Sequence, residues 1–98
     1  MQIKDEEINL RITPKTIIEV EKMYEDFDIL GLFRNAGTKE PRLTDYYMVI
    51  YAGYVGAKYV DEGKKIETTF EEFLNLIEDI SFEDISRIGV NLLLTRKN

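Results

Sequence analysis

The stretch INLRITPKTIIEVEK, residues 8–22, changes from one hydrophobic period to another within a single peptide. In its first half, polar residues alternate with the apolar residues Ile8, Leu10 and Ile12. This two-residue period is typical of a half-buried strand. Thr13 then suits an N-cap, and Pro14 suits the first helical position, where a missing N–H group breaks no helical hydrogen bond. The stretch therefore predicts a short β-strand that leads directly into a helix.

Apolar residues at helical spacing predict four main helices, and each helix begins at a residue that suits an N-cap. These N-caps are Thr13, Thr44, Thr69 and Ser81. The last helix has an apolar face made by Phe82, Ile85, Ile88 and Leu92. Between the first two helices, residues 28–35 predict one or two helical turns. The expected fold class is mainly α: a small helical domain of four main helices plus a short helix, with a short N-terminal β-strand, in a single domain over residues 1–98.

A single strand leaves its backbone N–H and C=O groups without partners. Two partners are open for residues 8–12: an extended piece at residues 66–68, or a strand from another chain. The second alternative makes Ile8, Leu10 and Ile12 an element of strand-mediated assembly. A chain of 98 residues also buries only a small core. Both considerations predict weak self-association into a homo-oligomer.

The composition excludes several classes of site. The chain has no cysteine and no histidine, so it lacks disulfides, thiolate chemistry and the commonest metal ligand. Residues 61–72 have the length of a calcium loop, but Gly63 falls at the third position, where a ligand is needed, and not at the sixth. Neither a glycine-rich phosphate loop nor a nucleophile motif is present. We therefore expect no metal site, no cofactor, no catalytic residue and no enzymatic activity.

The charge distribution argues against nucleic acid as a partner. The net charge is −6, and residues 61–84 hold nine carboxylates against two lysines. Phosphate binding requires clustered lysine and arginine, which this chain lacks. No apolar run approaches the roughly 20 residues that a membrane helix needs. We therefore expect a cytoplasmic protein that binds neither nucleic acid nor a membrane.

The helix that begins at Thr44 carries the candidate binding residues. Tyr47, Tyr51, Tyr54 and Lys58 lie on one stripe of this helix. Two alternatives stay open for the tyrosines: a partner-binding surface, because tyrosine is enriched at interfaces, or the core, where each hydroxyl needs a buried hydrogen-bond partner. Gly53 and Gly56 are costly inside a helix, so they favour the close approach of another helix or backbone.

The order of these elements resembles the small tail assembly chaperones of long-tailed bacteriophages and gene transfer agents. The resemblance rests on a short strand followed by ITPKTIIEVEK, a brief turn at DILGLFRNAG, a helix with tyrosines and glycines, and TTFEEFLNLIEDI near the end. It covers most of the chain as a pattern of elements.

The resemblance implies a non-enzymatic role in virion assembly within the cytoplasm of a bacterial host. Chaperones of this kind bind the aggregation-prone tape measure protein, keep it soluble, and help to recruit the tail tube protein. Two alternatives remain: an acidic helical regulatory module, antitoxin-like or inhibitor-like, and a minor structural tail protein. A regulatory module that mimics nucleic acid would need its carboxylates in one exposed array.

Overall fold

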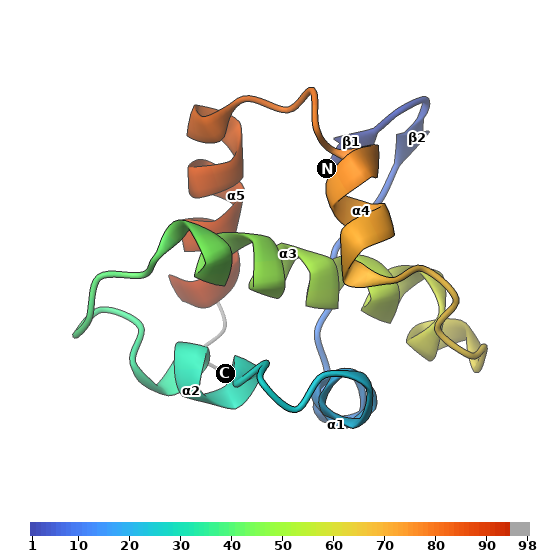
Figure 1. Ribbon diagram of the computed structural model, residues 1–98, viewed down its shortest axis with the longest axis horizontal. Helices are drawn as coiled ribbons and strands as arrows, with labels where there is room; N and C mark the ends of the chain where they lie inside the picture. The colour runs from blue at the N-terminus through green and yellow to red at the C-terminus, as the bar shows by residue number, and fades with distance from the viewer. Residues whose placement is uncertain (95–98) are drawn as a thin grey trace.

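Helix α3, Leu43–Lys58, runs through the middle of the computed structural model, which describes residues 1–94 (Figure 1). All of its residues from Met48 to Gly56 are buried. A helix that is apolar on every side must be covered on every side, so α3 organises the core. It contacts α1 (Pro14–Met23), α2 (Ile29–Arg34), α4 (Phe70–Leu76) and α5 (Phe82–Leu94).

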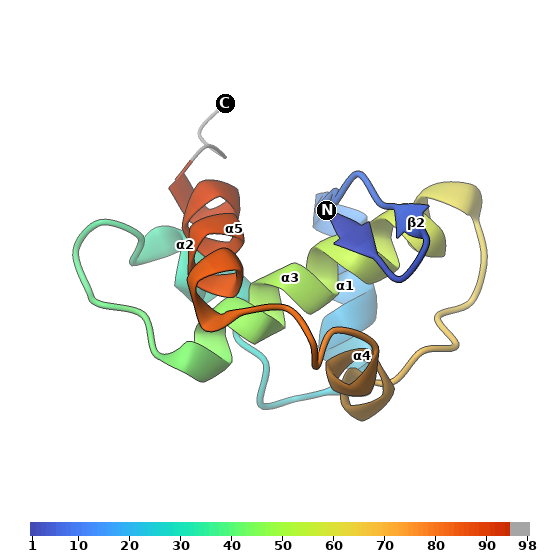
Figure 2. The ribbon, with the colours of Figure 1, turned by 90° about the horizontal axis from the view of Figure 1, so that it is seen from above.

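The arrangement around α3 places its two ends in different surroundings. In the view from above, α5 crosses the N-terminal half of α3, while the N-terminal hairpin lies over its C-terminal half (Figure 2). At the first crossing, Gly89 of α5 leaves room for the ring of Tyr46. A single 3₁₀ turn, η1 (Val60–Glu62), follows α3 before the chain returns toward α4. The prediction of a mainly α fold with four main helices and one short helix is confirmed.

Local capping explains where most helices begin. The Thr13 side chain accepts a hydrogen bond from the Thr16 N–H, and the Thr69 side chain accepts one from the Glu72 N–H at 3.1 Å. Ser81 accepts from the Asp84 N–H at 3.1 Å in the same way. The prediction for Thr44 is wrong, because α3 already begins at Leu43.

The Asp45 carboxylate is the reason for this earlier start. It accepts a hydrogen bond from the Arg42 N–H at 2.9 Å and so fixes Arg42 as the capping residue. The sequence-based position was therefore two residues too late.

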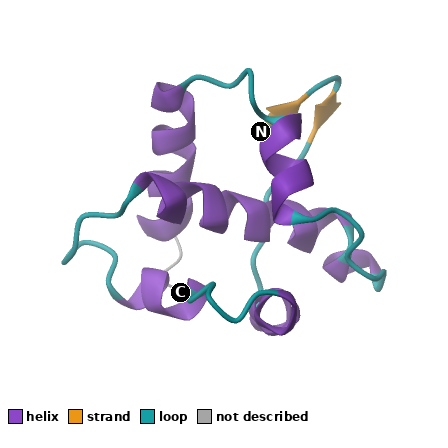
Figure 3. Cartoon of the chain, in the orientation of Figure 1, coloured by secondary structure: helices purple, strands orange, loops and turns teal. Residues whose placement is uncertain are grey.

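The prediction of a strand through Ile8, Leu10 and Ile12 is wrong. The strands are β1, Gln2–Ile3, and β2, Glu6–Glu7, which pair antiparallel in a two-residue hairpin. Residues 8–12 are drawn as a loop in Figure 3. Their alternation of apolar and polar residues is real, since Ile8 and Ile12 are buried and Asn9 and Arg11 are exposed.

The extended segment 8–12 lies across helix α3 and not beside a strand. The Arg11 N–H donates to the Gly53 carbonyl at 3.1 Å, and the Arg11 carbonyl lies against Gly56. A helix offers no ladder of free backbone groups, so this segment is extended and half-buried without belonging to a sheet. Residues 66–68 do not pair with it either, because the described sheet contains only β1 and β2.

An aromatic cluster fills the core between α1, α3 and α4. The Tyr51 ring centroid lies 5.4 Å from that of Phe70 and 5.6 Å from that of Phe73, and Tyr24 and Phe27 complete the cluster. Phe82, expected on the inner face of the last helix, is 59% exposed instead. It is the first residue of α5, where the helix has only begun to approach α3. Among residues 1–94, no helix is both long and apolar enough to cross a membrane.

Candidate functional site

The tyrosine stripe of α3 faces the interior. Tyr51 is fully buried and Tyr54 is 6% exposed, and the Tyr51 hydroxyl donates to the Thr68 carbonyl at 2.7 Å. Tyr47 is half-buried and packs against the core. The prediction of a partner-binding surface is therefore wrong for Tyr51 and Tyr54. Both residues belong to the core, because α3 is covered on every side there.

Lys58, the last member of the stripe, is held by the hairpin. Its Nζ lies 3.1 Å from both carboxylate oxygens of Glu6. This hydrogen bond with Glu6 raises the pKa of Lys58 above its ordinary value. This ion pair links β2 to the C-terminal end of α3. Lys58 therefore helps to position the hairpin.

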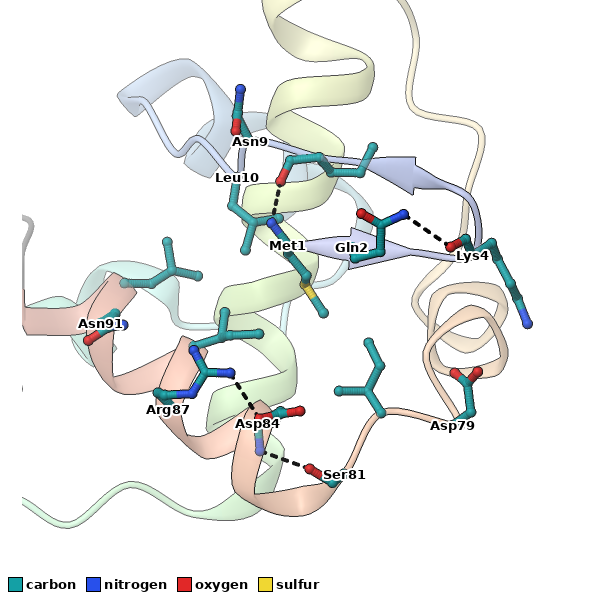
Figure 4. A pocket seen from close by; sticks show the side chains of 14 residues that line it. Met1, Gln2, Lys4, Asn9, Leu10, Asp79, Ser81, Asp84, Arg87 and Asn91 are labelled. Carbon is teal, nitrogen blue, oxygen red and sulfur yellow. Dashed lines mark hydrogen bonds and ion pairs between the residues drawn. The ribbon is translucent and has the colours of Figure 1, made fainter.

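A groove of about 830 Å³ lies between the N-terminal residues and α5. We call it the α5 groove. Its apolar floor consists of Met1, Ile8, Leu10, Ile80, Ile88 and Leu92. Its polar rim includes Lys4, Asn9, Asp79, Asp84, Arg87 and Asn91. Figure 4 shows Met1 and Leu10 on one side of the groove and the side chains of Asp84 and Arg87 on the other.

Two charged side chains on the rim of the α5 groove, Arg87 and Asp84, form an ion pair. Arg87 donates to the Asp84 carboxylate at 2.9 Å, and this contact lowers the pKa of Asp84. The Met1 ammonium group lies 2.7 Å from a Glu7 carboxylate oxygen. An ionised carboxylate held by a guanidinium does not donate a proton at neutral pH, so the rim suits docking better than acid–base chemistry. The described residues contain no group of three or more potential metal ligands.

Of the predicted site residues, only Ile8 and Leu10 line the α5 groove. Ile12 is buried in the segment before α1, and the stripe of α3 does not line this groove. The sequence-based interpretation missed Ile88 and Leu92, although it placed both on the apolar face of the last helix. The missing signal was that this face is broader than α3 can cover, which leaves both residues half-buried. No family model matches the chain, and no curated protein or solved structure has a significant match to it.

The ionisation of Tyr51 predicts how stability depends on alkaline pH. Burial is the main cause that raises the pKa of Tyr51 above its ordinary value near 10, and Tyr24 adds to it. The folded protein thus holds this proton more tightly than the unfolded chain does. The stabilisation is complete below about pH 10 and is lost as the pH rises further. We expect the free energy of unfolding to fall more steeply above pH 10 for the wild type than for Tyr51→Phe.

Denaturant titrations at a series of alkaline pH values measure this difference. The two proteins differ only at residue 51, so the difference between their slopes reports on the Tyr51 hydroxyl. Equal slopes in the two proteins would contradict the assignment of the raised pKa to Tyr51.

Proposed function

We propose that this protein is a non-enzymatic assembly chaperone of the phage tail type. In this proposal it binds the tape measure protein in the cytoplasm of the bacterial host and keeps it soluble until the tail tube protein assembles around it. The order of elements in the sequence supports the proposal through its resemblance to such chaperones. The α5 groove is the structural observation that carries it.

The construction of the α5 groove suits a protein partner. An apolar floor supplies binding free energy when water leaves it, while a polar rim keeps the unoccupied surface soluble. The floor combines residues from the N-terminal segment with residues from α5, so it runs between two separate parts of the chain. An open groove of this kind admits a segment of a long partner without requiring the whole partner to be folded.

The carboxylates of residues 61–84 favour this proposal over a mimic of nucleic acid. Such a mimic needs its charges free and in one array. Here the Asp61 carboxylate lies 3.2 Å from the Arg11 guanidinium, and Asp84 is paired with Arg87. Glu72 accepts a hydrogen bond from the Thr69 N–H at 2.9 Å. Three of the nine carboxylates in residues 61–84 therefore make contacts within the fold and are not free members of such an array.

Co-expression with the tape measure protein from the same gene cluster tests the proposal. We expect the tape measure protein to be mostly insoluble alone and soluble together with this chain, and the two to purify as a complex. A Leu92→Lys variant should weaken the complex by about 1–2 kcal/mol or more, because it places a charge on the apolar floor. The readouts are the soluble fraction and the dissociation constant of the complex.

Leu94→Lys is the matched control for Leu92→Lys. Leu94 lies on the same last turn of α5 but is half exposed and does not line the α5 groove. It should bind like the wild type, and thermal melts should show both variants folded. A tape measure protein that stays insoluble in the presence of this chain contradicts the proposal. Retention of the chain in finished particles would instead assign it to the structural tail proteins.

A further inference from the structure

The extended segment after β2 continues the ladder of the hairpin by one residue pair. The Ile8 N–H donates to the Met1 carbonyl at 2.8 Å, and the Met1 amine donates to the Ile8 carbonyl at 2.8 Å. This pair follows directly from the register in which Gln2 lies opposite Glu7. Met1 and Ile8 therefore form a hydrogen-bonded pair of the antiparallel type.

Leu10 lies at the next hydrogen-bonding position of this edge. In extended backbone, the N–H and C=O groups of alternate residues point to the same side, so those of Leu10 lie on the side of Ile8. Those of Arg11 lie on the opposite side, in agreement with the hydrogen bond from its N–H to Gly53 at 3.1 Å. Within residues 1–94, the backbone of Leu10 has no hydrogen-bond partner.

We propose that an extended, uncharged segment of a protein client adds to this edge as a new strand. The strand would run antiparallel to residues 8–12, in line with β1, and would bond to the backbone N–H and C=O of Leu10. This inference rests on the proposed function, because it states how a client occupies the α5 groove. Strand addition of this kind draws its affinity from backbone hydrogen bonds and its selectivity from the pockets under alternate side chains.

The chemistry of the α5 groove identifies the occupant. The unpaired groups are backbone groups, which another extended backbone matches in spacing. Alternate side chains of an added strand would point to the apolar floor, where Ile88 and Leu92 of α5 lie half-buried. The side chains of the rim balance Lys4 and Arg87 against Asp79 and Asp84, on a chain of net charge −6. A charged segment therefore gains nothing from this rim, and an uncharged one is not repelled.

Proline substitutions separate the two sides of the extended segment. Leu10→Pro removes the N–H group on the groove side, and its ring occupies the edge, so we expect client binding to weaken by at least about tenfold. Asn9→Pro is the matched control: it removes an N–H group from the opposite side of the same segment and should bind within about threefold of the wild type. Leu10→Val keeps the N–H and should bind like the wild type.

Hydrogen exchange supplies a second readout that needs no variant. The Leu10 amide should exchange quickly in the free protein and become protected when a client is added. Two probes are used: overlapping peptides that tile the tape measure protein, and a blocked peptide of alternating valine and threonine. Protection of Leu10 by either probe, together with the loss of binding in Leu10→Pro, supports the inference.

The outcomes distinguish the two proposals. If a tape measure peptide binds without protecting Leu10, strand addition is wrong while the chaperone function stands. If only the valine–threonine peptide binds and protects Leu10, the edge is real and the tape measure client is wrong. Binding by neither probe overturns the inference. If the Leu10 amide becomes protected as the protein concentration rises without any peptide, a second copy of the chain occupies the edge. That result would also overturn the inference.

Discussion

Tyr51→Ala is expected to lower the free energy of unfolding by about 3–5 kcal/mol. The side chain is fully buried among Tyr24, Phe27, Phe70 and Phe73, so its removal leaves a cavity that rigid rings cannot fill. The Thr68 carbonyl also loses its hydrogen bond from the Tyr51 hydroxyl. The total free energy of unfolding of a domain is only about 5–15 kcal/mol, so the variant should unfold on mild heating. Urea titration monitored by circular dichroism measures the change.

Two further variants divide this loss into its parts. Tyr51→Phe keeps the ring and removes only the hydrogen bond to Thr68, so it should cost about 0.5–1.5 kcal/mol. Tyr47 lies on the same helix but is only half-buried. Tyr47→Ala should therefore lower the free energy of unfolding by clearly less than Tyr51→Ala does. If Tyr51→Ala and Tyr47→Ala destabilise the protein equally and slightly, Tyr51 is not part of the core in solution.

The helices were predictable because the signals that start them are local. Thr13, Thr69 and Ser81 each accept a hydrogen bond from an N–H group three residues along, and the apolar residues that follow recur at helical spacing. These interactions need no information from the rest of the fold. Even the error at Thr44 is local, since a carboxylate at Asp45 competes with it to cap the helix.

The pairing of the N-terminus was not predictable, because a strand and an extended segment against a helix share the same hydrophobic period. Ile8 and Ile12 are buried by α3 and its neighbours, so their burial depends on tertiary contacts that the local sequence does not show. The real strands are two residues each, and the exposed Glu6–Glu7 pair of β2 gives no apolar alternation at all. Such a hairpin is below the length at which periodicity carries information.

The predicted binding site, the tyrosine stripe of α3, differs from the groove found in the structure for a related reason. The stripe of α3 has the composition of an interface, yet composition does not say which side of a helix is covered. From Met48 to Gly56 every side of α3 is covered, so Tyr51 and Tyr54 belong to the core, and the Tyr51 hydroxyl donates to the Thr68 carbonyl within it. The α5 groove arises where two segments far apart in the sequence, around Leu10 and around Ile88, leave space between them.

The same crossing that buries Ile8 and Ile12 also sets the position of the proposed edge at Leu10. Arg11 is fixed on α3 by its hydrogen bond to Gly53, and Ile8 is fixed by its bonds to Met1, the residue just before β1. Leu10 is held between these two anchors, so its backbone groups are presented in a defined direction. A preformed edge costs less entropy on binding than a flexible loop would.

Gly56→Ala tests whether this crossing is as close as the structure shows. Alanine is the better helix former by about 1 kcal/mol, so on helix propensity alone the substitution would stabilise α3. The added Cβ, however, would collide with the main-chain carbonyl of Arg11, and it would lie 3.0 Å from the Thr16 hydroxyl. A backbone that is anchored on both sides cannot move away cheaply. We therefore expect a net destabilisation of about 1–3 kcal/mol, as for other overpacked sites.

Asn75→Ala is the control for helix propensity, because Asn75 is an exposed residue of α4 and the same propensity argument predicts a small gain in stability there. Urea titrations of both variants show directly whether each substitution raises or lowers the free energy of unfolding. A further consequence concerns function: a displaced Arg11 shifts Leu10, so Gly56→Ala should weaken client binding even at temperatures where it is fully folded. If Gly56→Ala is as stable as the wild type or more stable, residues 10–11 do not cross α3 in contact with Gly56, and the edge proposed at Leu10 loses its anchor.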